Sequence, residues 1–412
     1  MTPGSNLRTP TAELIHQKLT NDYSTLRYKI EYNNYMSNHI LHAVVALYEL
    51  GASEQKIVEY AEHYTQKLEA ESPDHEDVVK NAATAVVLSS QDAQALLGKR
   101  QEYDALLAYY ARDVKKFGAE DAVRKHLSHL FSGMGGALLH GIIQLGFSYY
   151  FFDERLVSEG LAYLHYSYLP FDKPEESLCD GPLDFTRSTV MNLVSAVISD
   201  SSLRSEQDRI VAVSPLKDLN IGWIQRGLTA LSGHPTLGSP KAFSIIGNYI
   251  NNFNFTKFNS YVALDMIMWL FVMLEHNDFI MLHAVTSAWS LQQLKHLISP
   301  KKKAWRVWLQ VALSALVTSR VCDFRSKDIC KPSENLKDRL AALPSWSQLR
   351  EKALTVPGFP DEHVFKMVFI AQEYAKSDMN GYFLTRMERE FVARTAALVV
   401  ISKPFQTVAK PK

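Results

Sequence analysis

The chain has 412 residues, of which 47% are hydrophobic and 21% charged, a composition typical of a folded globular protein. Lys plus Arg and Asp plus Glu both number 44, so the formal net charge is zero, and this balance argues against nucleic acid, an anionic membrane or a highly charged substrate as partner. Three cysteines are too few for a disulfide framework and lack CxxC spacing, and the polar N-terminus lacks the apolar segment of a signal peptide. We therefore expect a reducing, cytoplasmic location.

Helical periodicity dominates the chain, and the alternation typical of strands is nearly absent. This pattern predicts an all-α fold, with a polar segment over residues 1–24 and a single large multi-helix domain over 25–412. Ser53 is the expected N-cap of a helix that includes Ile57 and Leu68, and Gly51 the expected end of the preceding helix. Further helices are expected over 25–50, 101–117, 120–131, 136–151, 154–167, 185–199, 259–275, 278–297, 302–322, 335–343, 361–376 and 380–402.

Residues 200–258 are the least regular part of the pattern, which indicates an irregular insertion, a lid over a pocket or an ordinary loop-rich connection. The most apolar stretch, residues 261–274, contains Asp265 and is too short for a membrane span, so a buried helix is expected there. Aromatic stretches at residues 147–152 and 269–271 favour either plain core packing or the wall of an internal, mostly apolar pocket.

The segment SNHILH carries the first candidate site residues, His39 and His42. Their spacing of three places both imidazoles on one helical face, within reach of one metal ion or substrate. Histidines so spaced on a helix are more often exposed or hydrogen-bonded than metal ligands, so the motif alone leaves both readings open.

His140 and His283 are lone polar side chains in otherwise apolar helical segments. Glycines flank His140 and allow close approach of backbone or ligand, while Thr286 lies about one turn after His283. A buried imidazole needs a hydrogen-bond partner, and that partner can be a simple backbone carbonyl. Each segment is therefore compatible with a core histidine whose ring is hydrogen bonded, and equally with a histidine that binds a metal or substrate.

His363 and Lys366 lie three residues apart on a face with apolar neighbours. A buried lysine has a depressed pKa, so Lys366 is a candidate base or nucleophile, and a neutral amine can also capture carbon dioxide as a carbamate that ligates a metal. The alternative is a lysine at a helix edge whose ammonium reaches solvent. Motifs of the commoner enzymes, such as HExxH, GxSxG and Walker A, do not occur.

The motifs SNHILHAVVALYELGA, LLHGIIQLGFSY, MLHAVTSAW and DEHVFKMV occur in this order and together resemble the questin oxidase-like family over about residues 25 to 400. The resemblance implies oxygen-dependent oxidation of aromatic polyketides, since questin oxidase opens an anthraquinone ring in a Baeyer–Villiger-like step with a reduced nicotinamide, and relatives serve fungal secondary metabolism. The implied site consists of His39, His42, His140, His283, His363 and Lys366.

The resemblance and the residue types together lead to an oxidoreductase hypothesis. His39, His140, His283, His363 and Lys366 would hold a non-haem iron, with Lys366 or His42 as catalytic base, and with NADPH as reductant where one is needed. The expected partners are a small aromatic substrate of the quinone or anthraquinone type and dioxygen. Ring cleavage and hydroxylation both fit this hypothesis.

One position departs from the family pattern, in which a second histidine follows the first by six residues in the third motif. Trp289 stands there, which implies either a lost ligand or a wall for stacking a flat aromatic substrate. The departure motivates an alternative, a metal-free cyclase, pericyclase or hydrolase with histidine acid–base catalysis. A third hypothesis is a non-enzymatic helical binding or scaffold protein.

Overall fold

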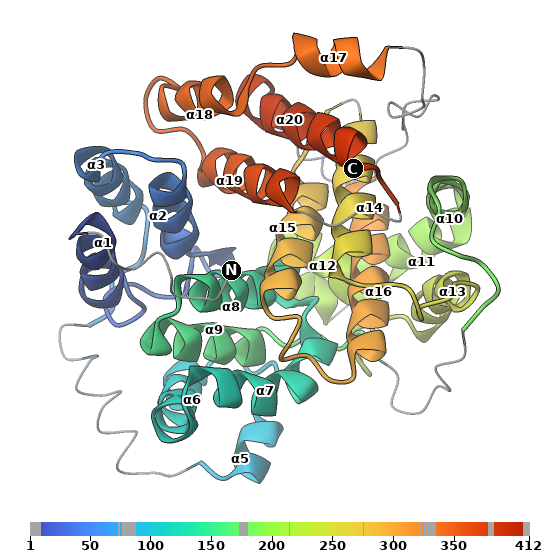
Figure 1. Cartoon of the computed structure of the whole chain (residues 1–412). Coiled ribbons are helices and arrows are strands. Elements are labelled where there is room, and N and C mark those ends of the chain that lie inside the picture. Colours follow the sequence, from blue (N-terminus) through green and yellow to red (C-terminus); the bar gives the residue numbers. More distant parts are fainter. Residues whose placement is uncertain are drawn as a thin grey trace.

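The computed structural model describes residues 10–72, 75, 88–172, 180–213, 215–274, 276–320, 324, 335–377 and 383–406. Helices make up nearly all of the regular structure in these residues (Figure 1), so the all-α prediction is confirmed. Cys179, Cys322 and Cys330 lie outside the described residues. No described helix combines the length and the apolar character that a bilayer crossing requires.

The first part of the chain forms helices α1 (Pro10–Asn21), α2 (Ile40–Glu49), α3 (Glu54–Thr65), α5 (Ser90–Ala95), α6 (Tyr103–Phe117), α7 (Ala119–Leu130), α8 (His140–Phe151), α9 (Glu154–Tyr166) and α10 (Arg187–Ser199). The second part forms α11 (Ser201–Ala212), α12 (Trp223–Ala230), α13 (Pro240–Asn251), α14 (Ser260–Met273), α15 (Phe279–Gln293), α16 (Lys301–Ser319), α17 (Leu336–Ala342), α18 (Trp346–Leu354), α19 (Glu362–Lys376) and α20 (Arg386–Ser402). Short 3-10 helices are η1 (Phe131–Gly133), η2 (Gly136–Leu139) and η3 (Leu216–Asp218). Strands β1 (Glu31–Tyr32) and β2 (Met36–Ser37) pair antiparallel, and β3 (Asn277–Asp278) and β4 (Phe405–Gln406) pair in parallel.

Four helices from distant parts of the chain surround the centre of the molecule. Helix α2 packs on α8, α8 on α15, α15 on α19, and α19 returns to α2, which closes a ring that can be followed in Figure 1. Helices α9, α14, α16 and α20 pack around this ring. The ring positions side chains that are far apart in sequence so that they face one another.

The buried helix expected over residues 261–274 is α14, in which Asp265 is only 1% exposed. Its carboxylate accepts hydrogen bonds from Arg389 of α20, 2.9 Å from Nε, and from the hydroxyl of Tyr374 in α19, at 2.6 Å. A buried charge that is paired and hydrogen-bonded in this way is tolerated in a core. Asp265 therefore connects α14, α19 and α20.

Both predictions at the boundary after α2 are confirmed. Ser53 accepts a hydrogen bond from the backbone N–H of Lys56 as N-cap of α3, and Gly51 has φ +82°. Only residues 40–49 of the helix expected over 25–50 are helical, because 31–37 form the β1–β2 hairpin. Asn33 and Asn34 turn this hairpin with positive φ, which asparagine tolerates better than most residues.

Two further predictions are corrected. Residues 10–21, expected to be part of a polar segment, form α1, which buries Ile15 and Leu19 and packs on α2. Residues 200–258 are also more regular than expected, because they contain α11, α12 and α13. The N-caps Asp200 and Ser239, the latter followed by Pro240 at the first helical position, were the local signals for two of these helices. That this region acts as a lid stays a prediction.

Glycines permit the close packing of α8 against its neighbours. A Cβ at Gly141 would lie 2.6 Å from Leu164 Cα of α9, and a Cβ at Gly160 of α9 would lie 2.6 Å from Leu145 Cα. A Cβ at Gly146 would lie 2.6 Å from Ser290 Cα of α15. The glycines after His140 thus serve close contact between helix backbones.

We expect Gly146→Ala to destabilise the protein by about 1–3 kcal/mol, because the new methyl group must push α8 away from the backbone of α15. Gly247→Ala in α13 is the matched control, since the nearest atom to its added Cβ is Gln310 Oε1 at 3.7 Å. This control should be neutral or stabilising by up to about 1 kcal/mol, because alanine favours helix interiors over glycine. Chemical denaturation midpoints measure both effects. Equal midpoints for the two variants would contradict the packing argument.

Candidate metal centre

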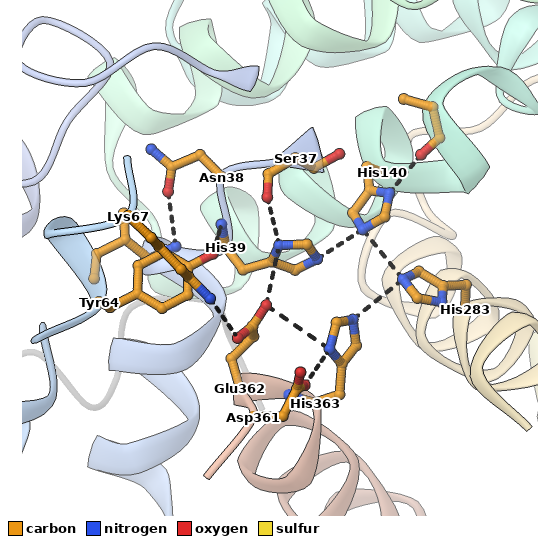
Figure 2. A network of polar contacts seen from close by, with 12 residues as sticks. Ser37, Asn38, His39, Tyr64, Lys67, His140, His283, Asp361, Glu362 and His363 are labelled. Atoms are coloured by element: carbon orange, nitrogen blue, oxygen red, sulfur yellow. Dashed lines mark hydrogen bonds and ion pairs between the residues drawn. The ribbon is translucent and has the colours of Figure 1, made fainter. Parts of the chain in front are cut away.

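Four histidines meet inside the ring of helices, one from each helix or its first cap (Figure 2). His39 Nε2 lies 2.7 Å from His140 Nε2, which lies 3.2 Å from His283 Nε2. His363 Nε2 lies 3.2 Å from His283 Nε2. All four side chains are buried. The four histidines expected to share one site do lie close together.

The other ring nitrogen of each histidine faces an oxygen. Nδ1 of His39 lies 2.6 Å from the Ser37 carbonyl oxygen, and Nδ1 of His283 lies 2.7 Å from that of Phe279. Nδ1 of His140 contacts the Ala137 carbonyl, and Nδ1 of His363 lies 2.6 Å from the Asp361 carboxylate. Carbonyl and ionised carboxylate oxygens only accept hydrogen bonds, so each Nδ1 carries the proton in the neutral ring and each Nε2 has a free lone pair.

Four Nε2 lone pairs pointing at one another repel, and a cation between them would turn this repulsion into coordination. The four ring centroids form a closed cycle with neighbouring separations of 4.6, 4.7, 4.9 and 4.8 Å. Neighbouring nitrogens at right angles around an ion, each about 2.1 Å away, would be about 3.0 Å apart. The observed spacings of 2.7 to 3.2 Å match this value, so the donor set fits a transition metal.

Local sequence explains how three of the four histidines are held. His39 is the residue before α2, and its backbone N–H donates to the hydroxyl of Tyr64 at 2.9 Å. Asp361 caps α19 by accepting from the backbone N–H of His363, and the same carboxylate oxygen accepts from the ring. In α15, His283 donates to the carbonyl of Phe279 one turn earlier.

His140 follows an unusual turn. Ala137, Leu138 and Leu139 have φ of +46°, +54° and +68°, a left-handed conformation that costs about 1–2 kcal/mol for each non-glycine residue. A Cβ at Gly136 would overlap the Ser167 carbonyl oxygen, so the turn is pressed against the chain after α9. The turn directs the Ala137 carbonyl at Nδ1 of His140. Residues 136–139, expected to be helical with 140–151, instead have left-handed dihedral angles at Ala137, Leu138 and Leu139 and so hold the His140 ring in place.

Carboxylates lie behind the ring of histidines. Glu362, 4% exposed, places its Oε1 3.4 Å from Nδ1 of His39 and 3.8 Å from Nδ1 of His363. Lys67 lies 3.4 Å from its other oxygen and over the Tyr64 ring. Carboxylates behind metal-bound imidazoles orient the rings and strengthen them as ligands. Sequence reasoning did not single out Asp361 or Glu362, although an Asp two residues before His363 is a recognisable helix-cap signal.

Burial lowers the pKa of His39, His140 and His283 well below the usual value for histidine, and neighbouring imidazoles and Lys366 act in the same direction. The cause is the cost of placing a charged ring in a site without water. Neutral imidazole is the form that binds metal, so the site is ready for coordination at neutral pH.

Lys366 lies beside this cluster with no exposed surface, and its Nζ has no hydrogen-bond partner among the described residues. Burial lowers the pKa of Lys366 to about 8. His42 is similar, because both of its ring nitrogens are buried without a partner in the described part of the chain, and burial lowers its pKa. Its ring packs 5.3 Å from that of His39 and 4.8 Å from that of Phe147. His42 thus borders the four-histidine cluster without joining it.

Trp289 lies outside the ring of histidines. It is buried, and its ring packs against Phe147, Tyr150 and Phe369 at 4.7, 5.3 and 5.3 Å. The four-histidine cluster is complete without a ligand at position 289. The substrate-binding role of Trp289 stays a prediction.

A helical protein that directs four buried imidazoles at one point in its core offers a group of donors that could hold a metal ion. The chain belongs to the questin oxidase-like family, because the family model described as Questin oxidase-like matches residues 36–369. The matched region contains all four histidines and Lys366. Membership implies an oxidoreductase and suggests aromatic polyketides as its substrates. The comparison with curated proteins gave no match.

The lowered pKa values predict how the stability of the metal-free protein depends on pH. The unfolded chain takes up protons on these histidines below about pH 6.5, whereas the folded chain does so only at lower pH, so acid favours unfolding. The free energy of unfolding should therefore fall as pH drops from about 7 to 5, by at most about 1.4 kcal/mol per pH unit for each histidine.

Chemical denaturation of chelator-treated protein from pH 5 to 8 measures this slope. His140→Gln removes one of the titrating groups and should make the slope shallower. His296→Gln alters an exposed histidine whose ring contacts Tyr149, and this control should keep the original slope. A parent protein whose stability does not change over this range would contradict the assignment of neutral buried rings.

Proposed function

We propose that this protein is a non-haem iron oxygenase that cleaves or hydroxylates a polycyclic aromatic polyketide of the quinone or anthraquinone type in secondary metabolism. The observation that carries the proposal is the convergence of four Nε2 atoms while each Nδ1 faces an oxygen, an arrangement in which a neutral ring has an unprotonated Nε2. Buried nitrogen lone pairs that face one another without a hydrogen-bond donor cost free energy, and a cation bound between them removes this cost.

Imidazole ligands suit iron, zinc, copper and nickel, so the donor set alone leaves several metals open. The family points to oxidation, and iron is one of the metals that imidazole binds and that reacts with dioxygen at non-haem sites. When bound, iron would supply the electron transfer to dioxygen that amino-acid side chains do not provide.

Lys366 is proposed as a fifth ligand through a carbamate. A neutral amine can attack carbon dioxide through nitrogen, form an N–C bond and release one N–H proton, which gives an anionic oxygen donor. The buried Nζ without a hydrogen-bond partner supports this role, since an ammonium there would be stabilised by the charges of Glu362 and Asp361 but would make no hydrogen bond among the described residues. In the unmodified form, Lys366 would instead serve as a general base.

His42 or Lys366 would accept the proton of a substrate phenol, because both are buried next to the histidine cluster. His42 is neutral there, and the lowered pKa of Lys366, about 8, leaves a larger neutral fraction than an ordinary lysine has. The resulting phenolate is electron-rich and reacts more readily with dioxygen. The apolar walls around these groups exclude water and strengthen the charge interactions made during proton transfer.

A dioxygenase route would place both oxygen atoms in the product, whereas a Baeyer–Villiger-like route inserts one atom and needs two electrons from NADPH to reduce the other to water. The described residues contain only two-stranded sheets, without the parallel sheet of a dinucleotide-binding fold. NADPH would therefore bind at a site of another kind or act indirectly, which favours the dioxygenase route.

The first test is the iron content of the purified protein after anaerobic reconstitution. We expect about one iron per chain in the parent and a loss of at least tenfold in iron affinity in His140→Ala, because one ligand is removed. His296→Ala is the matched control and should retain iron. Turnover by a parent protein free of transition metal would contradict the iron proposal and favour metal-free acid–base catalysis by His42 and Lys366.

The second test concerns Lys366. Protein supplied with carbon-13 bicarbonate should give a carbamate carbon signal in its NMR spectrum, and Lys366→Ala should abolish it. Lys352→Ala, which removes an exposed lysine of α18, should leave the signal unchanged. A parent spectrum without this signal, in iron-loaded and iron-free protein alike, would exclude the carbamate and leave Lys366 as the proposed base.

A further inference from the structure

A cavity of about 670 Å³ lies on the side of the metal centre formed by the turn before His140. Its walls combine the 136–138 turn, the end of α9 and residues 219–221 and 234–237. Leu138, Leu169 and Leu237 supply apolar surface, and Tyr166 and Tyr168 supply aromatic rings. The volume is in the range of cavities that bind small organic molecules, roughly 300–1,000 Å³.

Arg100 is the one lysine, arginine, aspartate or glutamate among the described residues that line this cavity. Its guanidinium lies over the Tyr166 ring, 5.3 Å from the centroid, and its Nη2 donates to the Glu31 carboxylate. Arginine has five N–H donors, so one bond to Glu31 leaves others for an acceptor inside the cavity. Glu31 offsets the positive charge, so the site offers hydrogen-bond donors with little excess charge.

Arg100 is connected by hydrogen bonds to a proposed metal ligand. Glu31 Oε1 accepts from the Tyr163 hydroxyl at 3.0 Å, and that hydroxyl lies 2.5 Å from Ser37 Oγ. The backbone carbonyl of Ser37 then accepts from Nδ1 of His39 at 2.6 Å. Glu31 and Ser37 are direct partners across the β1–β2 hairpin, so the hairpin holds both ends of this connection together.

A second connection joins the cavity to the centre through the left-handed turn. Ala137 and Leu138 line the cavity, and the carbonyl of Ala137 accepts from Nδ1 of His140. Strained backbone of this kind persists where the surrounding structure holds it, and it concentrates at functional sites. Two of the four proposed ligands are therefore held by residues that also form or contact the cavity wall.

We propose that this cavity binds the substrate and that Arg100 is a specificity-determining residue. Arg100 would donate to an oxygen-rich edge of the substrate (a phenolate, a quinone carbonyl or a carboxylate), while Tyr166, Tyr168 and Leu138 contact the flat ring system. The choice of a hydroxylated polycyclic quinone as ligand rests on the function proposed above. The location of the site and the role of Arg100 rest on the cavity and its hydrogen bonds.

Equilibrium binding of questin under anaerobic conditions tests the inference, followed by protein fluorescence and by the absorbance of the quinone. Two variants change the cavity in different ways. Arg100→Leu removes the donors, and Leu237→Trp reduces the free volume while keeping the Arg100–Glu31 pair. Lys99→Ala is the matched control, because Lys99 is the exposed cation next to Arg100 in sequence and does not line the cavity.

We expect Arg100→Leu to raise the Kd for questin by about ten- to a hundredfold, as the loss of hydrogen bonds to a charged donor does. Leu237→Trp should raise the Kd by at least about tenfold through lost space. The Kd of Arg100→Lys should lie between those of the parent and Arg100→Leu, because the positive charge is kept and the planar guanidinium with its several N–H donors is lost. Lys99→Ala should bind as the parent does.

Iron content is measured on the same samples, which separates this inference from the proposed function. Parental questin affinity in both Leu237→Trp and a folded Arg100→Leu, with iron bound, would overturn the substrate cavity and leave the iron proposal intact. Weakened binding in both variants of a protein that takes up no iron would support the cavity and overturn the iron proposal. If Arg100→Leu does not fold because Glu31 loses its partner, Leu237→Trp and Arg100→Lys decide the question.

Discussion

The proton on Nδ1 of each cluster histidine is the constraint on which the rest of the site depends. An imidazole hydrogen bonded at Nδ1 to an oxygen presents an unprotonated Nε2 on its opposite side. Ser37, Ala137, Phe279 and Asp361 supply these oxygens, three from backbone carbonyls and one from a side chain. Because backbone carbonyls cannot change protonation state, the direction of the lone pairs is built into the fold itself.

Close helix packing and nearby carboxylates maintain this orientation of the histidine rings. Helix α8 approaches α9 and α15 closely because Gly141, Gly146 and Gly160 have no side chains, and this brings His140 to His283. Asp361 and the adjacent Glu362 supply negative charge on the outer side of two rings, where it favours a bound cation without occupying the centre. The closed ring of α2, α8, α15 and α19 then excludes water from the site.

Burial has a second consequence, which concerns the groups beside the cluster. The same burial that lowers the pKa of the cluster histidines also lowers the pKa of His42 and of Lys366. Bases with lowered pKa beside the proposed metal site would suit the activation of phenols, which connects the electrostatics of the core to the oxidation implied by the family. The neighbouring cavity adds shape and hydrogen-bond donors, so metal ligation, proton transfer and substrate recognition would rest on adjoining parts of one core.

The sequence by itself determined the helical class and drew attention to the four histidines that converge, because helical periodicity is local and the histidines occur in ordered, recognisable motifs. The separate assignments of His39 as a metal ligand and His42 as a catalytic base came with the family resemblance. The spacing of three alone suggested a shared helical face, whereas His39 precedes the helix as its cap and turns toward His140. The sequence also contained no sign of the β1–β2 hairpin or the left-handed turn at Ala137, whose conformations are stabilised by contacts with distant segments. The tertiary structure alone decided that four histidines, each 80 to 143 residues from the next along the chain, meet at one point, because that depends on how whole helices pack.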